Sequence, residues 1–556
     1  MSVPEEPVKS IHKAALALSP LVVLGVCAGP AQAADQGRVP EGAVWSQHYF
    51  PSSGGVELHA DVLLPEKRKK GQKLPVILSV GPYFGHAGQM GPEGFKKTGP
   101  SARFNDLIEQ GGALERGYAL VMVDSRGFGG STGCHDLAGP GEQADVKAAI
   151  DWAAKQPWSS GAVAMYGKSY DAITALVGNN TDHPALKATV AMEPIWEPYR
   201  NFRSDGVPRA TIAQVAQQYI TIATSPQMPD DSKRYRKNAA WETKNPLCLA
   251  EIMNGYRTAD RDSAYWEARD LPAQAAGTKT PLFFTQGFTE WNTEAEGLRE
   301  FLANHEGTER GWLGPWAHDR PNDRRPDGRL QVGRGGWFKE VFAFYDEHLK
   351  GKKPNTTYPT FAVQDSNGRW RGQDAWPLAD AEAEVSLKTG EFVDDGREST
   401  YVTHSEPVQK ATRITGTPEM DVSADTDSEV QVKLYDVAPG GKAVMFDMQV
   451  SRFSNGRTAF ELRSTDWVLK KGHSLAVEIG TVQPGIPTAS DWLASPTGKT
   501  VKITDAHLRV ALDDPADDRR TSGEPAPFLA EYSTAYTVDL KQRLTGSPSF
   551  TLPLSR

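Results

Sequence analysis

The feature that most constrains the fold is a series of short apolar runs that alternate with helix-compatible segments from about residue 56 onward. The run at 56–62 alternates apolar and polar residues with a period of two, as a half-buried strand does. Apolar runs bounded by turn residues follow at 75–80, 119–123, 162–166 and 188–192. Continuous apolar strands separated by helices are typical of a parallel sheet that is covered on both faces. The pattern therefore predicts an α/β fold.

This pattern is interrupted once and later replaced, which predicts how the chain is divided. Between residues 195 and 275 the strand rhythm stops, and helical spacing predicts an inserted helical cap. Short strands resume at 281–287 and 311–314. Beyond residue 378 many short alternating strands are typical of a jelly-roll β-sandwich. The predicted units are residues 35–194 and 276–378 for the α/β domain, 195–275 for the cap, and 379–556 for an all-β jelly-roll domain.

The first 34 residues have the layout of a secretory signal peptide. Lys9 and Lys13 precede an apolar stretch at 14–28, and the small-residue sequence Ala31-Gln32-Ala33-Ala34 follows it. An uncleaved membrane anchor is the alternative, but the stretch is short for a span and Pro20 interrupts it. We therefore expect a secreted protein with no stable membrane insertion after cleavage of residues 1–34.

Charge and cysteine content exclude some functions and leave one question open. The net charge of −9 gives no basic surface for nucleic acid. No Cys/His spacing resembles a zinc site, so neither a metal nor a cofactor is predicted. Cys27 would leave with the signal peptide, and export makes a disulfide between Cys134 and Cys248 possible without showing that the two residues meet. The oligomeric state has no signal in the sequence.

A candidate nucleophile follows the strand at 162–166. This strand runs into Gly167-Lys168-Ser169, and residues 173–177 are helix-compatible. A serine on a sharp strand-to-helix turn is exposed, and the helix N-terminus directs backbone N–H groups at developing negative charge. Asp171 stands where the second glycine of the G-x-S-x-G motif is usual, so an ordinary Gly-x-Ser loop is the alternative.

A serine nucleophile needs a base and an orienting carboxylate, which in α/β-hydrolases follow in the chain order Ser, acid, His. Glu290 comes just after the strand at 281–287, and His318 comes just after the strand at 311–314. Glu294 lies within one helical turn of Glu290 and competes for the role of the acid. The order predicts an α/β-hydrolase domain with Ser169, Glu290 and His318 as its triad.

Several segments together carry a specific family resemblance: Gly81-Pro82-Tyr83, residues 124–133, Tyr166-Gly167-Lys168-Ser169-Tyr170 and Gly314-Pro315-Trp316-Ala317-His318. With these segments the chain resembles the cocaine-esterase-like hydrolases and X-Pro dipeptidyl-peptidases of the serine peptidase S15 type. The resemblance implies that the Tyr83 hydroxyl and the Tyr170 backbone N–H form the oxyanion hole, and that the C-terminal part is the family's jelly-roll domain. Glu290 departs from the aspartate that is normal in the family.

The expected function is that of a secreted serine hydrolase that forms an acyl-enzyme with a small-molecule ester or amide, or with a short peptide. An activity like that of an X-Pro dipeptidyl-peptidase is one form, and a broad-specificity carboxylesterase or acylase is the alternative. Cleavage after X-Pro needs a carboxylate for the substrate ammonium; Glu193, Glu197 and Asp205 are candidates unless they are ordinary solvated or capping residues. A third alternative is an inactive scaffold that binds carbohydrate or cell wall.

Overall fold

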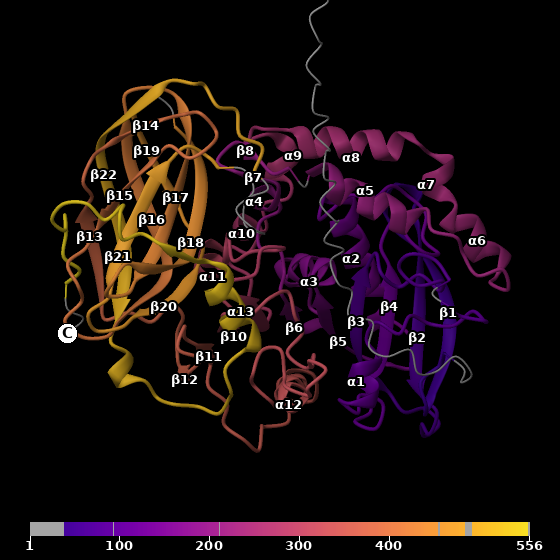
Figure 1. Ribbon diagram of the computed structural model, residues 1–556. Coiled ribbons are helices and arrows are strands. Elements are labelled where there is room, and N and C mark those ends of the chain that lie inside the picture. The colour runs from indigo at the N-terminus through magenta and orange to yellow at the C-terminus, as the bar shows by residue number, and fades with distance from the viewer. Residues whose placement is uncertain (1–37, 93, 211, 454–455, 484–491, 554–556) are drawn as a thin grey trace, which may run out of the picture.

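The computed structural model describes residues 38–553 except 93, 211, 454–455 and 484–491 (Figure 1). The expected signal peptide at 1–34 lies outside the described residues. Within the described part of the chain, no helix combines the length and the apolarity that crossing a bilayer requires.

A ten-stranded sheet forms the core of the first part of the chain, in the order β1-β2-β4-β3-β5-β6-β9-β10-β11-β12. The strands from β4 to β11 in this order are parallel, whereas β1, β2 and β12 pair antiparallel at the two edges. Their bounds are β1 Ala43–Pro51, β2 Glu57–Pro65, β3 Leu74–Gly81, β4 Ala119–Asp124, β5 Ser159–Lys168, β6 Leu186–Met192, β9 Leu282–Gly287, β10 Glu309–Gly314, β11 Phe361–Gln364 and β12 Trp370–Gln373.

Helices cover both faces of this sheet, as its continuous apolar strands predict. They are α1 Asn105–Glu109, α2 Pro140–Ala154, α3 Tyr170–Asn180, α11 Leu298–Asn304 and α12 Trp337–Lys350. Val76 and Leu78 of β3 share one buried cluster with residues of α2, α3 and α11. Ile77, between them, belongs to a second cluster with residues of α1 and α12. Alternate side chains of one strand therefore enter two different cores.

A mostly helical segment connects β6 to β9 and lies above the upper ends of the strands in Figure 1. It comprises α4 Pro198–Phe202, β7 Arg203–Ser204, β8 Val207–Pro208, α5 Ile212–Ala223, α6 Lys233–Ala239, α7 Trp241–Lys244, α8 Leu247–Arg257, α9 Ala264–Glu267 and α10 Leu271–Gln274. A disulfide between Cys134 and Cys248 attaches α8 to the loop that follows β4. The two cysteines, whose pairing the sequence left open, therefore meet in the fold.

The last part of the chain forms two antiparallel sheets. The first contains β13 Ala381–Ser386, β14 Glu391–Val393, β16 Thr412–Ala424, β19 Gly456–Glu461, β20 Thr465–Leu469 and β22 Thr500–Asp513; the second contains β15 Thr400–His404, β17 Ser428–Val437, β18 Lys442–Phe453, β21 Ser474–Gly480 and β23 Thr537–Asp539. Ile414 and Leu508 of the first sheet share a buried cluster with Val432 and Ile479 of the second. The two sheets form a β-sandwich, and its jelly-roll topology stays a prediction.

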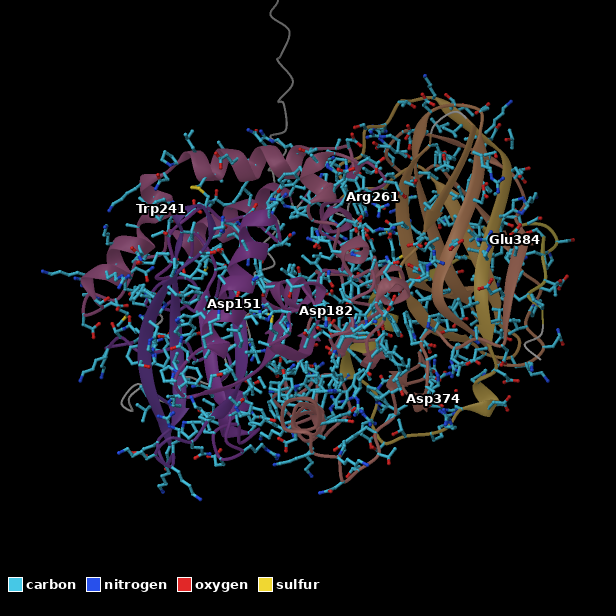
Figure 2. All side chains as sticks on the ribbon, turned by 180° about the vertical axis from the view of Figure 1, so that it is seen from behind. Asp151, Asp182, Trp241, Arg261, Asp374 and Glu384 are labelled. Atoms are coloured by element: carbon cyan, nitrogen blue, oxygen red, sulfur yellow. A yellow bond between two sulfur atoms is a disulfide. The ribbon has the colours of Figure 1, made fainter. Side chains whose placement is uncertain are left out.

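The remaining elements are η1 Ser53–Gly55, η2 Pro515–Asp517 and α13 Pro527–Ala535. Figure 2 shows the side chains from behind, with Trp241 on the helical segment and Glu384 at the far edge of the sandwich. Ion pairs join the two parts of the molecule, because Arg299 of α11 contacts both Glu419 and Glu461 of the sandwich.

Candidate active site

The candidate nucleophile Ser169 stands between β5 and α3 in a strained conformation. Its φ of 64° and ψ of −123° lie outside the regions that L-residues usually adopt. Its backbone N–H donates to the carbonyl of Met192 at the end of β6, 2.9 Å away. A Cβ on Gly167 would lie 2.0 Å from the carbonyl oxygen of Asp171, so only glycine fits there. The turn therefore has the geometry of a nucleophile elbow.

The candidate base and acid follow the carboxyl ends of two adjacent parallel strands. His318 lies beyond β10 and Glu290 beyond β9, and Nδ1 of His318 is 3.4 Å from Oε2 of Glu290. The Glu290 carboxylate accepts bonds from the backbone N–H groups of Asn292 (2.9 Å), Thr293 (2.7 Å) and Glu294 (2.6 Å). The Glu294 carboxylate is paired with Arg209 instead. Of the two glutamates, Glu290 thus faces the imidazole.

The pKa shifts of His318 and Glu290 are those expected of a neutral base beside an ionised acid. Burial lowers the pKa of His318 below its usual 6.5, Lys168 lowers it further, and Glu290 opposes the shift. Burial works against ionisation of Glu290, but His318 and the hydrogen bonds from Thr293 and Asn292 bring its pKa below 4.5. Nε2 of His318 is buried and has no hydrogen-bond partner among the described residues. That nitrogen is the one a general base uses when the other contacts a carboxylate.

The two oxyanion candidates present different groups. Burial raises the pKa of the Tyr83 hydroxyl, which lies 2.9 Å from the Tyr219 hydroxyl of α5. The Tyr83 ring centre is 6.4 Å from that of Tyr170, the residue after Ser169. The Tyr170 side chain points away, because its hydroxyl donates to Glu142 at 2.9 Å. Tyr170 is the first residue of α3, where a backbone N–H has no acceptor within the helix. A phenol and a helix N-terminus thus lie beside the serine.

Two residues that we did not predict support this arrangement. Arg103 pairs with Asp171, donates to the carbonyl of Lys168 at 2.9 Å, and lies 4.1 Å from the ring centre of Tyr83. Burial raises the pKa of Asp171 to about 6, although Arg103 opposes the shift. Asp171 therefore occupies the position of the usual elbow glycine, and there it pairs with an arginine that contacts Tyr83, the candidate oxyanion donor. The two residues are 68 positions apart in the sequence, and no local pattern predicts this pair.

The carboxylates considered for a substrate ammonium have other contacts. Glu193 accepts bonds from the Gly287 N–H (2.8 Å) and Trp316 Nε1 (2.9 Å), and burial raises its pKa to about 8. Glu197 pairs with two arginines, Arg200 and Arg261.

Asp205, the third candidate, follows β7, and burial raises its pKa while Arg200 opposes the shift. No described hydrogen bond or ion pair joins any of these three carboxylates to Ser169 or His318.

The large, mostly parallel sheet with its flanking helices is an architecture of the α/β-hydrolase type. Comparison with known proteins shows what the chain is similar to. Residues 54–320 match the family model described as X-Pro dipeptidyl-peptidase (S15 family). The resemblance seen in the sequence is thereby confirmed for this segment, which is about half of the chain.

Individual relatives include both peptidases and esterases. The chain is 29% identical over 216 residues to the Xaa-Pro dipeptidyl-peptidase of Lacticaseibacillus rhamnosus, covering 36% of this chain and 26% of that protein. It is 23% identical over 372 residues to the cocaine esterase of Rhodococcus sp. (strain MB1 Bresler), covering 61% of each. The chain thus spans less than two thirds of either relative.

A solved structure shows the fold. The CocE/NonD family hydrolase from Staphylococcus aureus superposes with a TM-score of 0.63 at 17% identity, covering 84% of this chain and 94% of that one.

Proposed function

We propose that the protein is a serine hydrolase that forms an acyl-enzyme on Ser169. The observation that carries the proposal is the strained elbow of Ser169, next to which the Tyr83 and Tyr170 rings lie 6.4 Å apart, together with the pairing of His318 with Glu290. A serine held in this way has a candidate base and candidate oxyanion donors within one site.

In the proposed mechanism, Nε2 of His318 takes the proton of the Ser169 hydroxyl while Oγ attacks the substrate carbonyl carbon. The Tyr83 hydroxyl and the Tyr170 backbone N–H donate to the oxyanion. His318 then returns the proton to the leaving alcohol or amine, which departs and leaves the acyl group on Oγ. In the second step His318 takes a proton from water, whose oxygen attacks the acyl carbonyl carbon. His318 then returns the proton to Ser169 Oγ as the acid is released, and Glu290 keeps the imidazole oriented throughout.

The substrate class is an ester or amide of a small acyl group, or a short peptide. The names of the relatives support two forms, an X-Pro dipeptidyl-peptidase and an esterase. The contacts of Glu193 and Glu197 favour the esterase form, because both carboxylates are already bonded and an α-ammonium would need one that is not.

The experiment that tests the proposal compares two chromogenic substrates on the chain that starts after Ala34. Ala-Pro-p-nitroanilide reports dipeptidyl-peptidase activity, and a short p-nitrophenyl ester reports esterase activity. We expect turnover of the ester that disappears in Ser169→Ala. Preference for the anilide would identify the peptidase form instead, and equal turnover by Ser169→Ala would contradict the mechanism.

We also propose that the protein is exported, with residues 1–34 as its signal peptide. The disulfide between Cys134 and Cys248 supports export, because such bonds persist in oxidising compartments. N-terminal sequencing of the protein from a bacterial host's culture medium and periplasm tests this: a start near Ala34 is expected, and retention of the full chain in the cytoplasm would contradict it.

A further inference from the structure

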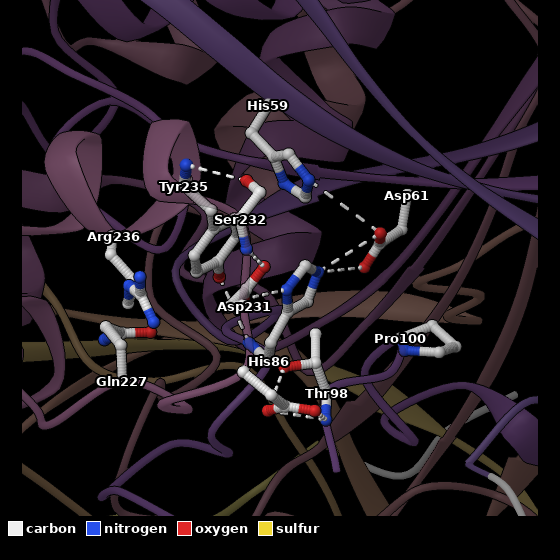
Figure 3. Close-up of polar contacts among 12 residues, drawn as sticks. His59, Asp61, His86, Thr98, Pro100, Gln227, Asp231, Ser232, Tyr235 and Arg236 are labelled. Atoms are coloured by element: carbon white, nitrogen blue, oxygen red, sulfur yellow. Dashed lines mark hydrogen bonds and ion pairs between the residues drawn. The ribbon is translucent and has the colours of Figure 1, made fainter.

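A second cluster of chemically competent side chains lies apart from Ser169, between β2 and the segment that connects β6 to β9 (Figure 3). His59 and Asp61 project from β2 on the same face, and His86 follows β3. One nitrogen of each histidine and one Asp61 oxygen lie within 4.8 Å of one another, and all three residues are buried. Neither the spacing along the sequence nor a motif predicts this group.

A carboxylate beside Nδ1 fixes the orientation of each imidazole. Nδ1 of His59 is 2.8 Å from Oδ2 of Asp124, and Nδ1 of His86 is 2.6 Å from Oδ2 of Asp231. When Nδ1 donates its proton to a carboxylate, the lone pair of a neutral imidazole is on Nε2. Histidines that bind metal ions are held in this manner, because the carboxylate sets the tautomer and raises the basicity of the ligand.

Both Nε2 atoms converge on Asp61. Nε2 of His86 is 3.1 Å from Asp61 Oδ2, and Nε2 of His59 is 3.9 Å from Asp61 Oδ1. His59 is 1% exposed, yet its Nε2 has no hydrogen-bond partner among the described groups. A buried nitrogen without a hydrogen-bond partner destabilises the fold, so its position calls for a ligand. A cation between the three side chains would satisfy it.

The dimensions and charges also fit a cation. Ligand atoms at the corners of a zinc tetrahedron are about 3.3 Å apart, so modest side-chain rotation would close the present 4.8 Å spread. The carboxylates of Asp61, Asp124 and Asp231 surround the two rings, so negative charge remains there even if both imidazoles are protonated. A divalent ion would offset most of this buried charge.

We propose that His59, Asp61 and His86 bind one divalent transition-metal ion of the zinc type. Two imidazoles and a carboxylate are ligands that zinc accepts, and their burial indicates a structural site. The ion would connect β2 to the loop that carries Tyr83, three residues before His86. Through Asp231 it would also fix that loop against the start of α6. The proposal concerns binding and does not depend on the catalytic assignment.

Metal uptake by the untagged chain after Ala34 tests the proposal. The protein is stripped with dipicolinate, dialysed with added zinc, and analysed by mass spectrometry for metal content and by calorimetry for Tm. We expect about one zinc per chain and a Tm rise of at least about 3 °C. His59→Gln should lose both effects. His305→Gln is the matched control and should keep them, since His305 is also buried but bonds to Glu309 and the Thr280 carbonyl.

Cobalt provides a measurement that needs no variant. Co²⁺ added to the stripped wild-type chain should give the intense visible absorption of a four-coordinate site, and one equivalent of zinc should abolish it. A wild-type chain that takes up neither metal, or a folded His59→Gln chain that still binds one zinc, would overturn the proposal. The cluster would then be an ion-pair network without a metal.

Discussion

At the scale of single residues, the Tyr83 ring lies 6.4 Å from that of Tyr170, the residue after Ser169, so removal of the Tyr83 hydroxyl tests the oxyanion assignment. We expect Tyr83→Phe to lower kcat/KM about 100- to 1,000-fold, since the loss of one preorganised oxyanion donor costs about that much. Steady-state kinetics on the p-nitrophenyl ester measure the effect. Tyr219→Phe is the control, because it removes a hydroxyl that touches Tyr83 rather than the substrate carbonyl. Equal losses in both variants would contradict the assignment.

The protonation of His318 predicts the acid limb of the pH profile. Burial and Lys168 hold the pKa of His318 below 6.5, and the base works only when neutral. Activity should therefore be full above that pKa and fall as the pH drops through it. Lys168→Gln removes a positive charge, so it should raise this pKa and move the limb to higher pH. Exposed Lys187→Gln is the control; an unmoved or lowered limb in Lys168→Gln would refute the electrostatic account.

At the scale of elements, the elbow depends on the closeness of β5 and α3. A methyl group on Gly167 would meet the backbone carbonyl of Asp171 at 2.0 Å, and backbone cannot rotate away as a side chain can. We expect Gly167→Ala to lower the unfolding free energy by about 3 kcal/mol and to abolish turnover. Gly335→Ala, whose new methyl has its nearest neighbour at 3.7 Å, should change neither. Thermal unfolding and ester hydrolysis measure both effects, and an active, stable Gly167→Ala would contradict the elbow geometry.

The elements that sequence patterns predicted well are those whose pattern is local. The apolar runs at 75–80, 119–123 and 162–166 lie within β3, β4 and β5, because strands buried on both faces need apolar residues at every position. The antiparallel edge strands β1 and β12 were not predicted, since β1 is partly exposed and tolerates a mixed sequence, and β12 is only four residues long.

Residue pairs that are distant in the sequence and meet only in the fold were not predicted either, unless a known chain order connected them. The order of Ser169, Glu290 and His318 was enough to propose a triad, because each follows a strand of one sheet. Arg103 beside Asp171, and the cluster around His59, join segments that no local pattern connects.

At the scale of the whole molecule, the β-sandwich holds the loop of the candidate acid. Trp291, next to Glu290, lies 3.6 Å beneath the Arg463 guanidinium and 5.7 Å from the Tyr536 ring. Trp291→Ala should lower kcat about 10- to 100-fold, because small displacements of a catalytic group are costly. The control is Trp241→Ala on the exposed side of α7 (Figure 2). An unchanged kcat in a folded Trp291→Ala would show that the sandwich does not position the acid.

The measurement that tests the central claim most directly is covalent labelling with a fluorophosphonate, which reacts with activated serines whatever the natural substrate. Intact-mass and peptide mass spectrometry report how many groups attach and where. We predict one adduct per wild-type chain, on Ser169, and none on Ser169→Ala or on the folded His318→Ala variant at the same exposure. A wild-type chain that stays unlabelled, or that is labelled at another residue, would contradict the account and favour a scaffold that binds without catalysis.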